Sequence, residues 1–271
     1  MPSYVITGVS RGLGWEFLRQ ISANPNNQVI GLVRDKKATD KRVSDQLAGR
    51  TNVNILEADL SDYDALKASV AATSRITGGS LDYLIANGAY VSKWDAYDPI
   101  GVLAEDPKEL EKQLVTLTTV NIVGNINLFK LYIPLLLKGQ AKKVISLTSG
   151  HADLDSINLI DIELAAGYSI SKAGMNIAVA KFSAQYKKDG LLFFSLSPGV
   201  VDVGSQADAT PEQMQKLGAM AAGFMKAYPE WKGPAQPEDA IRDMLAVIEK
   251  ASIEDGFGGS FVSHHGDKHW L

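Results

Sequence analysis

A tyrosine and a lysine four residues apart are the side chains of this sequence best suited to proton transfer. Tyr168 and Lys172 lie in a segment whose apolar residues recur at helical spacing, so their side chains share one helical face. A free tyrosine titrates at about 10, and a nearby lysine ammonium is expected to lower that pKa by stabilising the phenolate. The pair therefore predicts a general acid that works near neutral pH. The alternative is an ordinary amphipathic helix with a core-facing tyrosine and a surface lysine.

Three glycines near the start of the chain predict a phosphate-binding turn. Gly8, Gly12 and Gly14 follow the strand-like run Tyr4–Ile6 and open a segment, residues 13–21, whose apolar side chains line one helical face. Glycines there let a pyrophosphate approach the backbone, and the helix N-terminus supplies N–H donors and partial positive charge. For the motif in isolation a loop or C-cap glycine cluster is the alternative. Its place between a strand and a helix favours nucleotide binding.

The composition is that of an ordinary globular domain and indicates a small-molecule partner. Of 271 residues, 45% are hydrophobic and 21% charged, and the net charge of -4 gives no electrostatic case for nucleic acid or an anionic membrane. The absence of cysteine excludes disulfides and thiolate sites. The first strand leaves no room for a signal segment, and the most apolar run, Leu131–Leu137, is bracketed by Lys130 and Lys138 well short of membrane-spanning length. We expect a cytoplasmic protein.

Short apolar runs alternate with helix-patterned segments along the chain. This alternation predicts a single α/β domain over residues 1–271: a Rossmann-type, doubly wound parallel sheet of about seven strands with helices on both faces. The runs that predict strands are residues 4–6, 29–33, 53–56, 81–86, 143–147 and 191–196. Right-handed crossovers bring the carboxyl ends of these strands to one edge, where ligands of such sheets bind. Three longer segments are expected to be substrate loops at this edge, at residues 90–107, 150–167 and 200–235.

Together with other motifs between them, these features resemble the short-chain dehydrogenases/reductases in their single-domain form. The glycine turn reads Thr-Gly-x-x-x-Gly-x-Gly and the proton-transfer pair reads Tyr-x-x-x-Lys, as in that family. Further family elements follow in order over nearly the whole chain: Asp59-Leu60, Ala86-Asn87-Gly88-Ala89, Asn121, Ser149 and Pro198-Gly199. The loops and the C-terminal run at 258–262 look most like fungal members near the norsolorinic acid ketoreductase-like and sniffer-like carbonyl reductases.

The resemblance implies the roles of four residues. In the family's reaction a hydride passes from reduced nicotinamide to a carbonyl carbon, while the tyrosine, here Tyr168, protonates the oxygen. Ser149 would hold that oxygen, Lys172 would also bind the nicotinamide ribose, and Asn121 would steady a water relay from Lys172 to solvent. The interval between Ser149 and Tyr168 is longer than usual, which leaves three other hydroxyl residues as rivals of Ser149, namely Ser146, Thr148 and Ser156.

The charges around the glycine turn favour NADP(H) over NAD(H). NAD enzymes of this fold usually place an acidic residue at the end of the second strand for the ribose 2′-hydroxyl, whereas this chain has Val33 and then Arg34. Arg11 precedes Gly12 in the glycine turn, so two guanidinium groups are available for a 2′-phosphate. The alternatives are that either arginine is merely solvated, or that Asp35 pairs with Arg34.

The residues expected to bind the cofactor come from the glycine turn, the ends of the following strands and the Tyr-x-x-x-Lys helix. They are Gly8, Ser10, Arg11, Gly12, Leu13, Gly14, Arg34, Asp59, Leu60, Asn87, Gly88, Tyr168, Lys172, Pro198, Gly199 and Val201. Val203 replaces a threonine that often touches the nicotinamide in the family, so backbone groups or Ser205 must take its place. No metal site is expected, because matching carboxylate spacing does not accompany the tail histidines, His264, His265 and His269.

These observations predict an NADP(H)-dependent carbonyl reductase or alcohol dehydrogenase. The alternative is an NADP(H)-sensing regulatory protein without catalysis, and an epimerase of the extended branch fits neither the glycine spacing nor the length. A homodimer or homotetramer is expected, because in the family the helices at 109–137 and after Tyr168 build the dimer, and Trp270-Leu271 is expected to pack at a subunit interface. Large side chains in the loops are candidates for an aromatic-lined ketone pocket: Tyr90, Trp94, Tyr97, Phe224, Met225 and Trp231.

Overall fold

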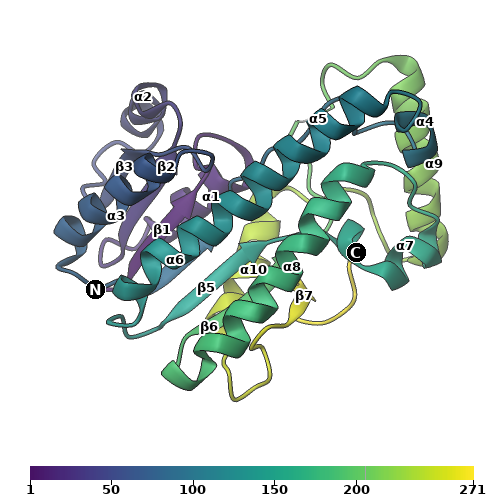
Figure 1. Ribbon diagram of the computed structural model, residues 1–271. Coiled ribbons are helices and arrows are strands. Elements are labelled where there is room, and N and C mark those ends of the chain that lie inside the picture. The colour runs from purple at the N-terminus through teal and green to yellow at the C-terminus, as the bar shows by residue number, and fades with distance from the viewer. Residues whose placement is uncertain (205) are drawn as a thin grey trace.

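Seven parallel strands form one sheet with helices on both faces, in a single domain (Figure 1). The computed structural model describes residues 1–204 and 206–271. The strand order is β3-β2-β1-β4-β5-β6-β7, and every neighbouring pair is parallel. The order reverses between β1 and β4, which places the switch point of the sheet at the carboxyl ends of these two strands. The strands are β1 (Ser3–Thr7), β2 (Gln28–Val33), β3 (Val53–Glu57), β4 (Tyr83–Ala86), β5 (Lys143–Leu147), β6 (Leu192–Ser197) and β7 (Phe261–Ser263).

Helices follow almost every strand, as the alternation in the sequence predicts. They are α1 (Gly12–Ile21), α2 (Lys36–Gln46), α3 (Tyr63–Thr77), α4 (Ile100–Leu103), α5 (Pro107–Thr118), α6 (Gly124–Leu136), α7 (Leu154–Ile160), α8 (Ala166–Tyr186), α9 (Pro211–Ala227) and α10 (Pro237–Lys250). A π-helical turn, η1 (Thr119–Val123), joins α5 to α6, and two short 3-10 turns are η2 (Gly150–Ala152) and η3 (Lys187–Asp189).

Successive residues of the central strands face opposite sides of the sheet and build two separate cores. Val5 and Val144 belong to the core under α3, α6 and α8. Their neighbours Ile6 and Ile145 belong to the core under α1 and α10. All four side chains are fully buried. Because both faces are covered, these strands are apolar throughout rather than alternating between apolar and polar residues.

The three segments expected to be loops contain helices of their own. Residues 90–107 include α4, residues 150–167 include α7, and residues 200–235 include the seventeen-residue α9. The start of α9 is a capping box, in which Gln213 N donates to Thr210 Oγ1 and Thr210 N donates to Gln213 Oε1. Figure 1 shows α4, α7 and α9 together at the end of the domain away from the N-terminus, near the outer end of α5.

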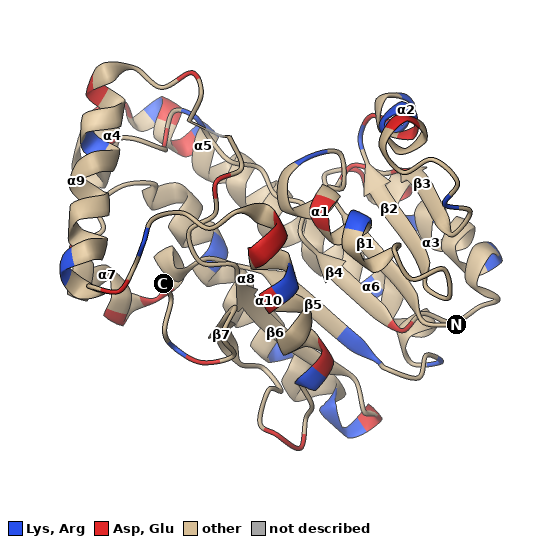
Figure 2. Cartoon of the chain, turned by 180° about the vertical axis from the view of Figure 1, so that it is seen from behind, with Lys and Arg blue, Asp and Glu red and all other residues tan. Residues whose placement is uncertain are grey.

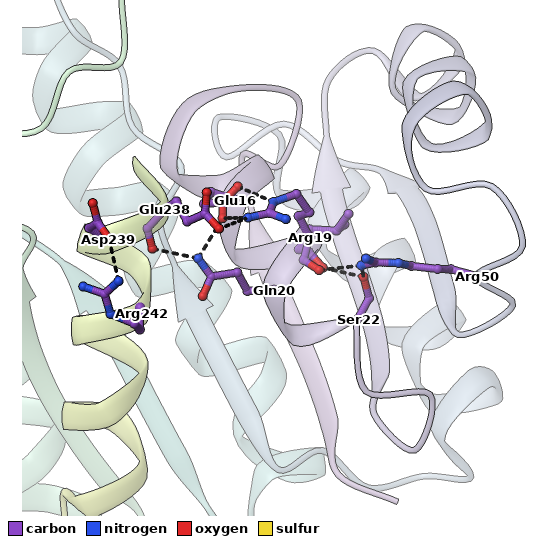
Figure 3. Close-up of polar contacts among 9 residues, drawn as sticks. Glu16, Arg19, Gln20, Ser22, Arg50, Glu238, Asp239 and Arg242 are labelled. Carbon is purple, nitrogen blue, oxygen red and sulfur yellow. Dashed lines mark hydrogen bonds and ion pairs between the residues drawn. The ribbon is translucent and has the colours of Figure 1, made fainter. Parts of the chain in front are cut away.

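Polar contacts join the first and last long helices on one face of the sheet (Figure 3). Glu16 of α1 accepts two hydrogen bonds of 2.7 Å from the Arg19 guanidinium and one of 2.7 Å from Gln20 Nε2. Gln20 Nε2 also donates to the main-chain carbonyl of Glu238 in α10 at 2.8 Å. These contacts fix α1, and with it the glycine turn that precedes it, against α10.

The surface helices carry charges of both signs close together (Figure 2). On α2, Lys36 pairs with Asp40, and Lys41 pairs with Asp45 at 2.6 Å, each four residues apart. Such exposed pairs stabilise a helix by only a few tenths of a kcal/mol. Together these pairs add to the helical stability of α2, which has few apolar residues.

The continuous stretch Pro107–Leu136 is long and apolar enough, by length and composition, to cross a membrane. In this fold α6 supplies core residues, among them Phe129 and Tyr132, which are fully buried. The Tyr132 hydroxyl forms a 2.9 Å hydrogen bond with Ser69 Oγ of α3. The apolar character of α6 is therefore accounted for by packing between the sheet and its neighbouring helices.

Candidate active site

Hydrogen bonds hold the end of β1 and the glycine turn against β2 on one side and against the loop after β4 on the other. Gly8 N donates to Leu32 O at 2.8 Å, and Asn87 Nδ2 donates to Thr7 O at 2.9 Å. Gly88 N donates to Thr7 Oγ1 at 2.7 Å. A Cβ at Gly8, whose φ is +73°, would lie 2.9 Å from Gly88 Cα, so a side chain there would collide with the next strand's loop. The structure thus brings the two glycine motifs together at the switch point.

The N-terminus of α1 is free to bind an anion. Aspartate side chains cap four other helices: Asp35 for α2, Asp62 for α3, Asp106 for α5 and Asp153 for α7. At α1 the cap position is Arg11, which makes no capping hydrogen bond, and the first turn has no acidic residue. Its orphan N–H groups and dipole suit a pyrophosphate. The turn and helix of this chain therefore fit a dinucleotide cofactor.

Three arginines surround this turn, of which the sequence analysis identified two. Arg11 and Arg34 are exposed. The alternative pairing of Arg34 with Asp35 is not found in the described chain, where Asp35 Oδ1 accepts from Ala38 N at 2.9 Å. The third is Arg42 of α2, whose guanidinium carbon lies 3.9 Å above the Trp15 ring. Its Nη1 donates to Ser10 O in the glycine turn at 2.8 Å.

Arg42 carries its charge without a carboxylate partner in the ranges 1–204 and 206–271. Besides Ser10 O it bonds only the neutral amide oxygen Gln46 Oε1, at 3.2 Å. Burial lowers its pKa, which shows that its charge is partly desolvated. No local pattern in the sequence marks Arg42, because its partners Ser10 and Trp15 are distant in sequence.

Asp59 and Leu60 follow β3, and Leu60 lies close to the loop after β4. Leu60 Cδ1 would be 3.3 Å from a Cβ on Gly88, and Leu60 O would be 2.4 Å from one on Gly124 of α6. Asp59 Oδ1 accepts hydrogen bonds from Ser61 N and Ser61 Oγ, at 2.8 and 2.7 Å. Leu60, one of the residues expected to bind the cofactor, is therefore next to Gly88 in the loop after β4.

Lys172 is a buried cation fixed at the carboxyl end of β5. It is 6% exposed, and its Nζ donates to Leu147 O at 2.7 Å. Nζ also lies 5.5 Å from the centroid of the Tyr168 ring. Tyr168, one turn earlier on α8, is only partly buried. The two side chains thus share one helical face, as their spacing predicts, at the edge of the sheet where ligands bind.

The first turn of α8 is held by a residue that the sequence analysis missed. Asp95, 2% exposed, accepts hydrogen bonds from Gly167 N at 2.8 Å and Tyr168 N at 2.7 Å. Ala165, the residue before α8, has φ +57°. This left-handed conformation costs energy for a residue with a side chain. Asp95 compensates for it from the loop after β4. Nothing local to Asp95 in the sequence could reveal a partner seventy-two positions away.

Burial, rather than the lysine charge, dominates the pKa values of this pair. It raises the pKa of Tyr168 to about 12 and lowers the pKa of Lys172 to about 8. The expectation that Lys172 lowers the pKa of Tyr168 is therefore wrong for the protein alone. Two features explain this: the ammonium is 5.5 Å from the ring centroid, and it donates to a main-chain oxygen instead of the phenol. At neutral pH the phenol is protonated and able to donate.

Asn121 lies in the π-helical turn η1 and connects the loop after β4 to α8. Its Oδ1 accepts from Tyr90 N at 2.7 Å, and its Nδ2 donates to Tyr90 O and to Ser171 Oγ, both at 3.0 Å. Ser171 Oγ in turn donates to Tyr168 O at 2.7 Å. The side chain is thus fully engaged in positioning the segments around Tyr168. Such π-helical turns occur frequently at functional sites.

Ser149 lies two residues after the end of β5 and is partly exposed at the carboxyl edge of the sheet. Its Oγ accepts from His151 N at 3.2 Å. Of its three rivals, Ser146 and Thr148 are buried in and just after the strand, and Ser156 is buried on α7. Because Ser149 alone among them combines the strand-end position with partial exposure, the register favours it.

The segment after β6 returns to the glycine turn. Gly199 has φ +75°, and Val201 forms an isolated parallel bridge with Ala235. Val203 Cγ1 lies 3.7 Å from the position a Cβ on Gly12 would take. Val203, which stands in place of the family's threonine, therefore lies against Gly12 of the glycine turn. Ser205, the other residue considered for this role, lies outside the described residues.

The large side chains proposed for a ketone pocket fall into different environments. Tyr90 is an anchor, since its hydroxyl donates to Gln113 Oε1 at 3.1 Å. Phe224 is buried against Trp231 with ring centroids 5.4 Å apart, whereas Met225 is 55% exposed. Tyr97 lines a cavity of about 200 Å³ between the loop after β4 and the start of α9.

The C-terminal tail packs on its own chain. Trp270 is 4% exposed, and its ring lies 4.4 Å from that of Phe261 in β7, centroid to centroid. Because β7 and the loop after β5 of the same chain cover Trp270, its burial does not require a subunit interface. The His264 and His265 rings are tilted against each other with their centroids 3.9 Å apart, and in the described ranges no three His, Asp or Glu side chains converge on a metal position.

Comparison with known proteins places the chain in a family. The model of the short chain dehydrogenase family matches residues 3–214. Over the full length of both proteins, the chain is 60% identical to the short chain dehydrogenase virK of Hypocrea virens. It is 52% identical to the short-chain dehydrogenase/reductase iacC of Pestalotiopsis fici, again covering all of both chains.

Solved structures show the same fold at low sequence identity. The NADPH-bound carbonyl reductase from chicken fatty liver matches with a TM-score of 0.78 and 21% identity, covering 98% of each chain. The carbonyl reductase Sniffer of D. melanogaster matches with the same TM-score, identity and coverage. With the glycine turn at the switch point and Tyr168 and Lys172 on α8, this chain belongs to the short-chain dehydrogenase/reductase family of oxidoreductases.

Proposed function

We propose that this protein is an NADPH-dependent carbonyl reductase, which in the reverse direction acts as an alcohol dehydrogenase. The observation that carries the proposal is the buried Lys172 ammonium, fixed on Leu147 O at the carboxyl end of β5, with Tyr168 one helical turn away. A buried lysine without a carboxylate is costly to a fold. Its retention next to a protonated phenol, at the edge that carries the dinucleotide turn, supports a catalytic function.

The residues of this chain have separate tasks in the proposed reaction. The bound nicotinamide would supply the hydride to the carbonyl carbon. Tyr168, kept protonated by its raised pKa, donates its hydroxyl proton to the carbonyl oxygen as negative charge develops there. Ser149 donates a hydrogen bond to the same oxygen and orients it. Lys172 stabilises the resulting phenolate and, with a pKa of about 8, is suited to return the proton near neutral pH.

The arginines around the glycine turn support NADPH as the cofactor. Arg11, Arg34 and Arg42 have no carboxylate partner in the described chain, and Arg42 is held on the turn itself by Ser10 O. A 2′-phosphate would gain charge-assisted hydrogen bonds from them. The solved chicken carbonyl reductase of the same fold carries NADPH. A cytoplasmic location stays a prediction from the sequence.

Replacing Tyr168 by phenylalanine tests the catalytic role. Tyr168→Phe removes the proton donor and leaves the ring, so NADPH affinity stays near its original value while turnover of a ketone falls by about a hundredfold or more. Turnover is followed by loss of reduced-cofactor absorbance, and affinity by cofactor fluorescence. Tyr186→Phe, on the same helix, is the control. Near-normal turnover of the Tyr168 variant would favour the regulatory alternative, which needs no proton donor.

The raised pKa of Tyr168 predicts opposite pH dependences for the two directions. Alcohol oxidation needs the phenolate, so its rate rises with pH from about 7 to about 10, because the phenol is still mostly protonated there. Ketone reduction needs the protonated phenol, so its rate does not rise over this pH range. Steady-state rates in both directions across the pH range measure this. A plateau of oxidation below about pH 8 would show that the loaded enzyme lowers the phenol pKa.

Arg42 is predicted to contribute to cofactor choice. Arg42→Gln removes a desolvated cation from the turn, so the ratio of the NADPH Kd to the NADH Kd rises about tenfold, the effect of one hydrogen bond to a charged group. Fluorescence titration of each cofactor gives both constants. Lys41→Gln, at the neighbouring exposed position on α2, is the control. An equal weakening of both cofactors would assign Arg42 to supporting the turn alone.

We further propose that two copies of the chain associate through α5 and α8. Four apolar side chains are exposed along these helices and η1, namely Val115, Val123, Ile170 and Ile177. Ile170 and Ile177 are seven residues apart and share a face of α8. A second copy with the same stripe would cover this surface, in line with the dimer expected from the sequence.

The association is tested by placing a charge in the stripe. Ile177 is 65% exposed, so Ile177→Glu costs the monomer little and destabilises the paired face, converting the dimer to monomer. Sedimentation velocity at micromolar concentration measures the mass. Met214→Glu, an exposed apolar site on α9, is the control. A monomeric mass for the unaltered protein would refute this interface.

A further inference from the structure

The C-terminal tail, residues 264–271, closes the edge of the sheet next to the candidate active site. A Cβ on Gly150, the residue after Ser149, would lie 3.2 Å from Trp270 Cβ. A Cβ on Gly199, after β6, would lie 3.4 Å from Trp270 O and 2.8 Å from His264 Cε1. The tail therefore touches the loops that follow two neighbouring strands, and at Gly199, whose φ is +75°, the contact leaves no room for a side chain.

Polar and cation-aromatic contacts hold the tail in this place. Ser263 N donates to Asp267 O at 2.8 Å, which turns the chain back after β7. Lys268 Nζ lies 4.7 Å from the Phe261 ring centroid and 5.1 Å from that of Trp270. The same Nζ pairs with Asp153 Oδ2 at 3.4 Å. This last contact joins the tail to the start of α7.

A cavity of about 220 Å³ lies between the tail, α7 and the end of α9. Because a cavity of about 150 Å³ holds benzene, this one accommodates one six-membered ring with small substituents. Its lining comes from α7, from the residue that ends α9 and from the tail: Asp153, Asp155, Ser156, Leu159, Tyr228, Lys268 and Trp270. Trp270 lines the cavity and contacts Gly150, the residue after Ser149, so one wall of the cavity lies against the loop that carries the candidate catalytic serine.

The lining combines ring-sized apolar surfaces with hydrogen-bond acceptors. Trp270, Tyr228 and Leu159 supply the apolar surfaces. Asp155 lines the cavity and is an exposed residue, and its carboxylate has no hydrogen-bond partner among residues 1–204 and 206–271. A carboxylate accepts hydrogen bonds and cannot donate them. A hydroxyl group on a bound ring would satisfy it.

The charges of the cavity disfavour an acidic ligand. Lys268, its one cation, is already paired with Asp153, and Asp153 Oδ1 accepts from Ser156 N at 2.9 Å. The burial of Tyr228 and the charge of Asp153 raise the pKa of the Tyr228 phenol, so this residue stays protonated and neutral. With two carboxylates against one paired ammonium, a carboxylate on the ligand would be repelled.

We propose that this cavity is a substrate subsite that takes the remote ring of a ketone, a neutral ring bearing at least one hydroxyl group that donates to Asp155. The inference rests on the proposed carbonyl reduction and adds the substrate class to it: hydroxylated aryl ketones whose carbonyl is separated from the recognised ring. The tail of the same chain forms one wall of the subsite through Trp270.

The test compares three ketones that differ only on the ring: benzylacetone, its para-hydroxy derivative and its para-carboxy derivative. With NADPH at saturation, the hydroxy ketone is expected to have a KM about tenfold below that of benzylacetone, and the carboxy ketone a higher KM than either. Asp155→Asn removes the charged acceptor, so the KM advantage of the hydroxy ketone over benzylacetone shrinks about tenfold. Glu163→Gln, an exposed acid outside the cavity, is the control variant.

Binding without turnover is measured independently with the hydroxy ketone as probe. In the presence of NADP+, its binding in the cavity quenches the tryptophan fluorescence of the protein, and Trp270→Phe removes that quenching. Quenching that depends on Asp155 but comes without reduction of any ketone would uphold the subsite and refute the proposed reaction. Reduction of benzylacetone with no preference among the rings would overturn the subsite and leave the reaction standing. Quenching absent from the unaltered protein would also overturn it.

Discussion

The hydrogen bond from Lys172 Nζ to Leu147 O fixes the geometry on which the candidate active site depends. An ammonium buried in this way needs an acceptor, because an unpaired buried charge costs several kcal/mol. The acceptor is the last carbonyl of β5, so the bond sets the rotation and height of α8 against the sheet. Tyr168 is one turn away on that helix, and Ser149 is two residues beyond Leu147. A single interaction thus positions both residues that we propose to bind the carbonyl oxygen.

The loop after β4 keeps α8 in this position from the opposite side. Asp95 holds the first N–H groups of the helix, and Asn121 connects Tyr90 of the loop to Ser171. Each of these polar groups is buried or half-buried, and each is satisfied, as a polar network in a low-dielectric region requires. These contacts hold the first turn of α8, which carries Tyr168, from the loop after β4.

The sequence predicted the sheet, its edge and the main motifs, because each depends on local spacing. Strands such as Lys143–Leu147 are short apolar runs between turns, and Tyr168 and Lys172 follow helical spacing. The short helices α4 and α7 were missed because four and seven residues carry little helical periodicity. The seventeen-residue α9 was missed although its capping box, Thr210 to Gln213, stands in the sequence. Asp95 and Arg42 were missed since their partners are distant in sequence. The pKa of Tyr168 and the packing of Trp270 depend on burial, which no local pattern encodes.

The π-helical turn η1 has a consequence for how the long segment Pro107–Leu136 is aligned along its length. A turn with i→i+5 bonds holds one residue more than an α-helical turn, so the faces of α5 and α6 are offset from a single continuous helical wheel. Asn121, the buried residue of this turn, faces the interior. Shortening η1 by one residue would restore an uninterrupted α-helix, and it would rotate everything on one side of the turn by roughly 100°.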